Sequence, residues 1–249
     1  MAGIYVHIPF CKSRCVYCDF FSTTRAGDVE RYVRALVREA EVRRGEALSQ
    51  GKACAAPVST IYFGGGTPSL MTPQQLDFIL DALHRNYCVA PDAEVTLEMN
   101  PDDVAGWGSV AAAGVNRVSL GIQTLDDGVL SLIRRRHDAQ TAVSAVRLLQ
   151  QAGIRNISID LIYGLPGQTM ELWQRDLEMA FALGIQHLSA YALSFEPGTA
   201  LTRWLQQGRV REAPDELSAE MYQVLCDKAR QAGFCHYEIS DFALPGFAS

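Results

Sequence analysis

Three cysteines near the N-terminus, Cys11, Cys15 and Cys18, have the spacing C-x3-C-x2-C. Three thiolates on one short loop can bind three irons of a [4Fe–4S] cluster and leave the fourth iron open to a small molecule. A structural zinc site with His7 as fourth ligand is the alternative, but such sites usually combine two knuckles that lie far apart in sequence. The spacing therefore favours an iron–sulfur cluster as the metal site.

Composition narrows the class of protein. The 249 residues suit one large α/β domain or two small ones. The net charge of −6 argues against a nucleic-acid binder. No apolar stretch approaches the length of a membrane span, and no signal-peptide pattern begins the chain. Because free thiols and an iron–sulfur loop need a reducing compartment, we expect a cytoplasmic location.

Short β-branched runs alternate with longer amphipathic stretches. These runs predict strands at residues 3–8, 58–63, 94–98, 116–121, 156–163 and 187–193, and helices at 28–48, 73–85, 103–113, 127–151 and 170–183. Six β–α units in a row imply a parallel sheet with external helices, and right-handed crossovers curl it into a partial (β/α)6 barrel of the TIM type. In such α/β folds the chemistry lies at the carboxyl ends of the strands.

The pattern changes after residue 195. A turn at residues 196–199 is followed by predicted helices at 200–207 and 215–231, and residues 237–242 have the pattern of a further strand. We therefore expect a core over residues 1–195 and a mainly helical extension over residues 196–249.

The second predicted strand ends in the sequence G-G-G-T-P at residues 64–68. Glycines let the backbone approach a ligand closely and expose peptide N–H groups, although a tight strand-to-helix turn would also use them. The run matches neither G-x-G-x-x-G nor the P-loop pattern, so neither a nicotinamide dinucleotide nor a nucleoside triphosphate is indicated.

Polar residues also mark the ends of the later strands. Glu98 could bond an amine or a ribose, or be a surface carboxylate, and Gln123 could bond a carboxylate or hydroxyl. One arginine of the run at residues 134–136 could hold a carboxylate, although such runs are usually solvated. Asp160 lies within an apolar strand, where a carboxylate is costly without partners, so we predict that it faces a polar barrel lumen.

Taken in order, these motifs resemble the radical S-adenosylmethionine (radical SAM) proteins of the oxygen-independent coproporphyrinogen oxidase-like group. The resemblance covers almost the whole chain. Its motifs are Tyr5 before the first cysteine, H-I-P-F-C, C-x3-C-x2-C, G-G-G-T-P, the strand end at Glu98, G-I-Q, R-x-H and D-L-I-Y-G-L-P-G-Q.

The resemblance implies a set of roles. Cys11, Cys15 and Cys18 would ligate the cluster, and the amine and carboxylate of S-adenosylmethionine would chelate its open iron. An electron, supplied by a donor such as flavodoxin or ferredoxin, would cleave this cofactor to methionine and a 5′-deoxyadenosyl radical. The implied cofactor-contacting residues are Tyr5, Phe20, Gly65, Gly66, Thr67, Glu98, Gln123, Arg135, Asp160 and Ile162.

One departure from the group concerns Phe20. Decarboxylases of the group carry a further cysteine at this position, whereas Cys-Asp-Phe is typical of the HemW-like branch of heme chaperones. The resemblance therefore implies heme binding and delivery to acceptor proteins, with coproporphyrinogen III oxidation as the alternative. No residue is assigned as catalytic.

A second departure concerns length. Members of the group continue for well over a hundred residues beyond this sequence and carry a histidine-containing heme-associated motif there. We therefore expect this chain to be an N-terminal part that holds the radical SAM core. The candidate heme ligands are its histidines, His7, His84, His137, His187 and His236.

Overall fold

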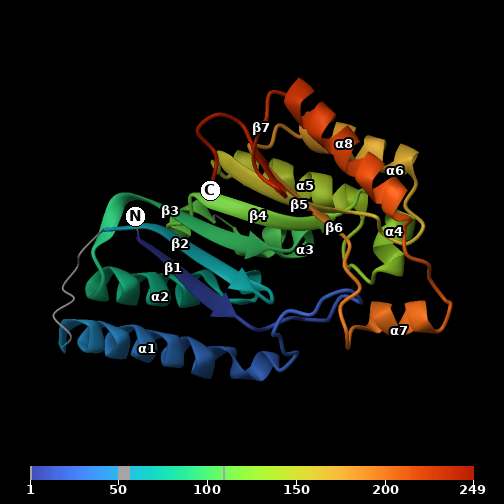
Figure 1. Ribbon diagram of the computed structural model, residues 1–249. Coiled ribbons are helices and arrows are strands. Elements are labelled where there is room, and N and C mark those ends of the chain that lie inside the picture. The colour runs from blue at the N-terminus through green and yellow to red at the C-terminus, as the bar shows by residue number, and fades with distance from the viewer. Residues whose placement is uncertain (1, 50–56, 109) are drawn as a thin grey trace.

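The computed structural model describes residues 2–49, 57–108 and 110–249. Its centre is one curled, open sheet with the strand order β1-β2-β3-β4-β5-β6-β8-β7, covered on its outer face by helices (Figure 1). The first six strands pair in parallel with their neighbours in sequence. They are β1 (Ala2–Ile8), β2 (Val58–Gly65), β3 (Val89–Met99), β4 (Arg117–Gln123), β5 (Asn156–Tyr163) and β6 (His187–Ala192). The predicted partial barrel is confirmed.

Most of the helices that cross over between these strands begin at a side-chain cap. The connections contain α1 (Val29–Ser49), α2 (Pro73–Asn86), α4 (Asp127–Leu132), α5 (Ala139–Gln151) and α6 (Met170–Ala182). Thr72 and Gln75 form a reciprocal capping box at the start of α2, and Asp138 and Thr169 cap α5 and α6. Each cap satisfies an N–H group that the first helical turn leaves free, which sets the start of each crossover.

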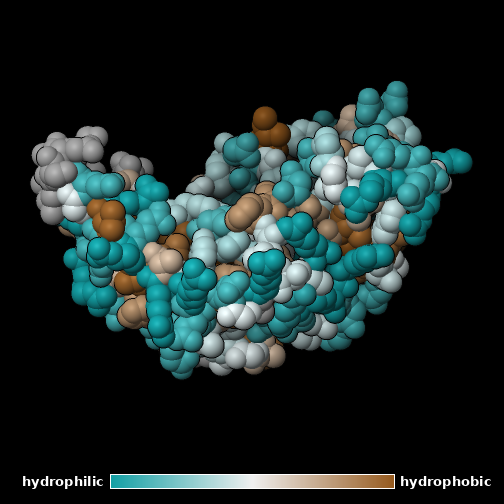
Figure 2. Space-filling view, turned by 90° about the horizontal axis from the view of Figure 1, so that it is seen from below, coloured by the Kyte–Doolittle hydropathy of each residue, from teal (hydrophilic) through white to brown (hydrophobic). Residues whose placement is uncertain are grey.

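The strands separate apolar from polar side chains because successive residues point to opposite faces of a sheet. In β5, Ile157, Ile159 and Leu161 are fully buried in the main hydrophobic core beneath the helices. The alternate residues Ser158 and Asp160 face the concave side. Figure 2 shows a hollowed, crescent outline and a mostly hydrophilic surface on the face in view.

The helix predicted at residues 103–113 is wrong. The structure has α3 (Pro101–Val104) followed by two separate 3-10 turns, η3 (Ala105–Trp107) and η4 (Ala111–Ala113). Gly108 and Gly114 have φ values of 61° and 77°, which a continuous right-handed helix excludes.

The extension adds both helices and strands. It contains α7 (Ala200–Gln206), α8 (Asp215–Gln231) and the hairpin of β7 (Cys235–Glu238) and β8 (Asp241–Ala243). Strand β8 pairs antiparallel with β6, so the central sheet continues past residue 195, and the division there stays a prediction. No helix in the described ranges is long and apolar enough to cross a bilayer.

Asp176 joins α6 to the chain after β4. Its side chain is fully buried and accepts hydrogen bonds from Thr124 Oγ1 at 2.6 Å and from the Leu125 N–H at 3.0 Å. We expect Asp176→Ala to lower the free energy of unfolding by about 3 kcal/mol, because both donors lose their acceptor inside the core. Urea denaturation would measure this change.

Glu178→Ala on the same helix is the matched control. Glu178 pairs with Lys228, but its side chain is 66% exposed, so its loss should cost less than about 1 kcal/mol. Equal losses of stability in the two variants would contradict the role assigned to Asp176.

Candidate functional site

The lumen of the half-barrel and the loop after β1 enclose a cavity of about 520 Å³, a size usual for ligand sites. The structure brings nearly all the predicted site residues to its wall: Cys11, Cys15, Cys18, Phe20, Gly65, Gly66, Thr67, Glu98, Gln123, Arg135, Asp160 and Ile162. Tyr5 is the exception, since it lies beside the cavity with its ring stacked on Tyr62 and its hydroxyl donating to His7 Nδ1 at 3.2 Å.

The thiols lie on the segment of residues 9–23 that follows β1, which we call the cysteine loop. Cys11 is buried and accepts from Thr67 Oγ1 at 3.6 Å, and Cys15 Sγ accepts from Arg135 Nη1 at 3.3 Å. Across the described ranges, no three His, Cys, Asp or Glu side chains are grouped to hold a single metal ion. In a [4Fe–4S] cluster each thiolate binds a different iron, so the thiols need not meet at one point. The donor set therefore fits a cluster.

His7 does not complete a zinc site with these thiols. Its Nε2–H donates to the Phe21 carbonyl at 3.0 Å, while Nδ1 accepts from Tyr5, so both ring nitrogens are engaged elsewhere. A neutral imidazole needs a free nitrogen to ligate a metal, and this geometry removes His7 as a fourth ligand.

Arg135 connects the cysteine loop to the strand ends. One amino group contacts Cys15, and the other donates to Asn100 Oδ1 at 2.7 Å and to the Gly121 carbonyl. Asn100 Nδ2 in turn donates to Thr67 Oγ1 at 3.3 Å, next to Cys11. A continuous chain of polar contacts therefore runs from Cys15 to Cys11 through the side chains of Arg135, Asn100 and Thr67.

Close packing at the end of β2 leaves no room for a side chain at any of its three consecutive glycines. A Cβ at Gly64 would lie 2.9 Å from Glu98 Oε1, and one at Gly66 would lie 2.8 Å from the Phe10 carbonyl oxygen. Gly65 has a φ of 114° and would place a Cβ 2.6 Å from the His7 ring. Tight chain packing thus explains the three glycines, while Gly65 and Gly66 also line the cavity.

Two carboxyl groups face the lumen. Glu98 accepts from the Tyr62 hydroxyl at 2.8 Å and from the Gly65 N–H at 3.1 Å, and burial raises its pKa. Asp160 accepts from Ser119 Oγ at 3.1 Å, and burial, followed by the charge of Glu98, raises its pKa to about 7. The predicted placement of Asp160 in a polar lumen is therefore found.

Backbone strain is concentrated at this cavity. Gln123 and Arg134 have φ values of 68° and 58°, and among the residues described they alone have positive φ without being glycine. Both line the cavity. Left-handed conformations at such residues cost about 1–3 kcal/mol each and gather at functional sites.

The sequence patterns did not identify several residues of the cavity wall as site residues. Asn100 follows Glu98 by two positions, a signal that the strand-end rule could have used. Arg117 lies in β4 with only 3% of its surface exposed, and a charged residue within an otherwise apolar strand was its signal. Tyr62 looked like an ordinary strand residue, and only the curvature of the sheet brings it to the lumen. His187, a candidate heme ligand from the sequence, lies on the same wall.

Comparison with known proteins gives the family. Residues 5–180 match the model of the radical SAM superfamily. The chain is 40% identical, over 97% of its length, to the heme chaperone HemW of Synechocystis, and 36% identical over its full length to HemW of Bacillus subtilis. It is also 38% identical to the mitochondrial radical S-adenosyl methionine domain-containing protein 1 of cattle. The chain spans 59%, 65% and 55% of these relatives' lengths.

Solved structures agree with this match. Coproporphyrinogen III oxidase (HemN) from Escherichia coli, a radical SAM enzyme, superposes with a TM-score of 0.82 at 26% identity, over 98% of this chain and 56% of that one. The archaeal Elp3 of Methanocaldococcus infernus shares the fold, with a TM-score of 0.64 at 17% identity, over 90% of this chain and 53% of that one. Because the family model matches most of the chain, and the fold and the cysteine loop agree with it, the chain belongs to the radical SAM superfamily.

Proposed function

We propose that this chain binds a [4Fe–4S] cluster on Cys11, Cys15 and Cys18 and S-adenosylmethionine along the strand ends, and that it binds heme for delivery to acceptor proteins. The observation that carries the cofactor proposal is the single cavity that collects the three thiols and the strand-end polar groups. Its wall includes Gln123 Oε1 and Arg135 Nε, two buried atoms that have no hydrogen-bond partner among the residues that the structure describes. Such atoms favour a polar ligand in the cavity.

The wall residues suit the parts of S-adenosylmethionine. Tyr62 and Gly65 orient the Glu98 carboxylate, which would accept from an amine or hydroxyl, and Ser119 holds Asp160 for the same task. Ile162 offers an apolar surface of the kind an adenine ring packs on. Arg135 holds the cysteine loop against the sheet. The bound cluster would supply the electron that cleaves the cofactor, while the protein positions the two groups.

Heme delivery is supported by similarity to the HemW chaperones and by Phe20. This residue stands where decarboxylases of the group carry a cysteine, and its ring is 66% exposed on the cavity wall, where it could contact a flat macrocycle. His137 and His187 are buried, and burial lowers the pKa of each to about 4. His84 and His236 are exposed, so a heme iron could reach each of them from solvent.

Oxidation of coproporphyrinogen III is the second candidate function. It is favoured by the close superposition on the Escherichia coli oxidase. Either function would need an electron donor such as flavodoxin or ferredoxin and a reducing compartment, for which we propose the cytoplasm. The name of the cattle relative places that protein in the mitochondrion.

Cys15→Ala should abolish cluster assembly, because it removes one of three ligands at the middle of the loop. We expect iron and sulfide contents near zero after anaerobic reconstitution, and loss of the visible charge-transfer absorption. Cys88→Ala is the matched control, since Cys88 is exposed and lies outside the cavity wall. A normal cluster spectrum in Cys15→Ala would refute the ligand assignment.

Asp160→Asn should stabilise the protein increasingly as the pH rises. The pKa of Asp160 is raised to about 7 in the fold, so the native state holds this proton more tightly than the unfolded chain does. The stabilising effect of the proton is complete below the unfolded pKa of ~3.9 and is lost as the pH rises through 7. The melting temperature of Asp160→Asn should exceed that of the wild type clearly at pH 8 and little at pH 4.

The same substitution should weaken S-adenosylmethionine binding by about tenfold, the loss of one charge-assisted hydrogen bond. Asp227→Asn on α8, outside the cavity, should change neither the melting curve nor the binding isotherm. A pH-independent difference in melting temperature would contradict the desolvation argument, and unchanged affinity would remove Asp160 from the cofactor site.

Heme titration should separate the two candidate functions. We expect saturable heme binding, seen as a shift of the Soret band, and no protoporphyrinogen when the reduced protein is incubated anaerobically with S-adenosylmethionine and coproporphyrinogen III. His236→Ala and His84→Ala would then identify the iron ligand by changing the heme spectrum. Turnover of coproporphyrinogen III would overturn the preference for heme delivery.

A further inference from the structure

The two ends of the cysteine loop are fastened to each other. Phe10 and Thr23 form a parallel β-bridge, the Cys11 N–H donates to the Thr23 carbonyl at 2.9 Å, and the Thr23 N–H donates to the Pro9 carbonyl at 2.6 Å. This pairing holds Cys11 at the base of the loop. It does not reach the middle of the loop, where Cys15 and Cys18 lie.

The middle of the loop is held by two other segments. Val16 lies between these two cysteines and is 2% exposed. Its carbonyl accepts from the Leu201 N–H at 2.9 Å, and its own N–H points to the Ile133 carbonyl at 3.5 Å. Leu201 lies in the first turn of α7, where N–H groups have no partner within the helix. Helix α7 therefore bonds directly to the Val16–Tyr17 peptide, between Cys15 and Cys18.

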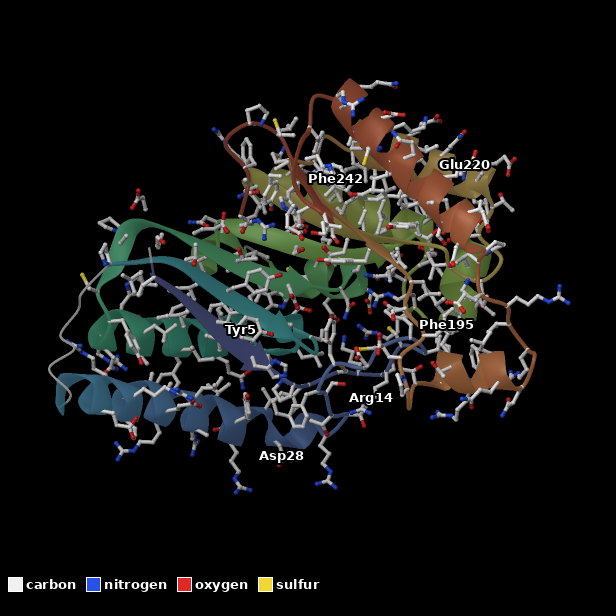
Figure 3. The ribbon with its side chains drawn as sticks, in the orientation of Figure 1. Tyr5, Arg14, Asp28, Phe195, Glu220 and Phe242 are labelled. Atoms are coloured by element: carbon white, nitrogen blue, oxygen red, sulfur yellow. The ribbon has the colours of Figure 1, made fainter. Side chains whose placement is uncertain are left out.

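Side-chain packing reinforces this contact. A second hydrophobic core, separate from the main one, includes Val16 from the cysteine loop, Ile133 from the end of α4, Ile162 from β5 and Leu201 from α7. Ile133 and Leu201 are fully buried. Figure 3 shows the cysteine loop and α7 in the same region of the molecule. Arg14 of the loop lies there, on the side where Phe195 leads into α7.

Helix α7 also supports the segment that carries Arg135. The Arg134 guanidinium lies 5.2 Å from the centre of the Trp204 ring, and Arg209 lies 4.8 Å from it. Arg134 has the strained positive φ of 58°, and the next residue donates to Cys15 Sγ. Cation–π contacts of this kind contribute about 0.5–1 kcal/mol each at exposed sites and help to hold the strained turn in place.

We propose that α7 positions the ligands of the cluster site. Leu201 holds the Val16 peptide and thereby positions Cys15 and Cys18. Leu201 is a positioning residue, since it acts through Val16. The proposal rests on the proposed binding of a cluster by the three cysteines. It assigns a role to a segment beyond residue 180, where the match to the superfamily model ends, and beyond the predicted core boundary at residue 195.

The test compares Leu201→Ala with Leu225→Ala. Leu225 is a fully buried leucine of α8 in the main core, so both variants should lose about 2–5 kcal/mol of stability. Each protein is reconstituted anaerobically, and the rate of iron loss to a ferrous-iron chelator and the electron paramagnetic resonance spectrum of the reduced cluster are measured. We expect Leu201→Ala to lose iron about tenfold faster than the wild type and to give a shifted spectrum.

The other variants make the outcome decisive. Leu225→Ala should retain the wild-type spectrum and iron-loss rate, and Leu201→Met, which refills the volume, should restore both. If Leu201→Ala does not fold, Val16→Ala tests the same contact from the loop and should give the same spectral change. A wild-type spectrum and rate in the folded Leu201→Ala or Val16→Ala protein would overturn the positioning role. Failure of the wild type to assemble a cluster would overturn the proposed function together with it.

Discussion

The register of the parallel strands is the constraint on which the whole site depends. Glu98 lies opposite Ser119, and Asp160 lies opposite Gly121 and Ser189, so the polar side chains of β3, β4 and β5 occupy two adjacent levels of the lumen. The alternate residues of the same strands fill the apolar core. Because side chains alternate with period two, a slip of one residue would send the carboxylates into that core and the apolar residues into the cavity. The hydrophobic core thus fixes the geometry of the polar site.

This arrangement buries charged groups in the lumen, and their desolvation lowers the free energy of unfolding. Arg117 is almost completely buried beside the carboxylates of Glu98 and Asp160, whose pKa values are raised by desolvation and lowered in part by its positive charge. In the described part of the chain, Arg117 Nε and Asp241 Oδ1 have no hydrogen-bond partner. Buried groups of this kind reduce stability unless a ligand or water satisfies them. The surrounding core therefore holds together a group of desolvated charges that oppose folding.

The sequence predicted best those features that depend on local pattern alone. Strand 156–163 and helix 215–231 were predicted to the residue, and the strand-end rule located Glu98, Gln123 and Asp160 on one cavity. Prediction failed at residues 103–113, where glycines with positive φ interrupt an apparently helical pattern. It also missed Asn100 and Arg117, because their roles arise from contacts between strands. No pattern in the sequence could show that Val16 and Leu201 are bonded, since such a contact exists only after the sheet has curled.

The cysteine loop differs physically from the rest of the site. The strand-end residues are positioned by a sheet whose backbone bonds are shared along its length, whereas the residues between Cys11 and Thr23 have no sheet to support them. The loop takes its support from its own base, from the turn that carries Arg135, from α7 and from the ion pair between Lys12 and Asp103 of α3. Phe20, on which the proposed preference for heme delivery rests in part, lies on this loop. Specificity can therefore change there without disturbing the strands, provided that the supports continue to hold the thiols in place.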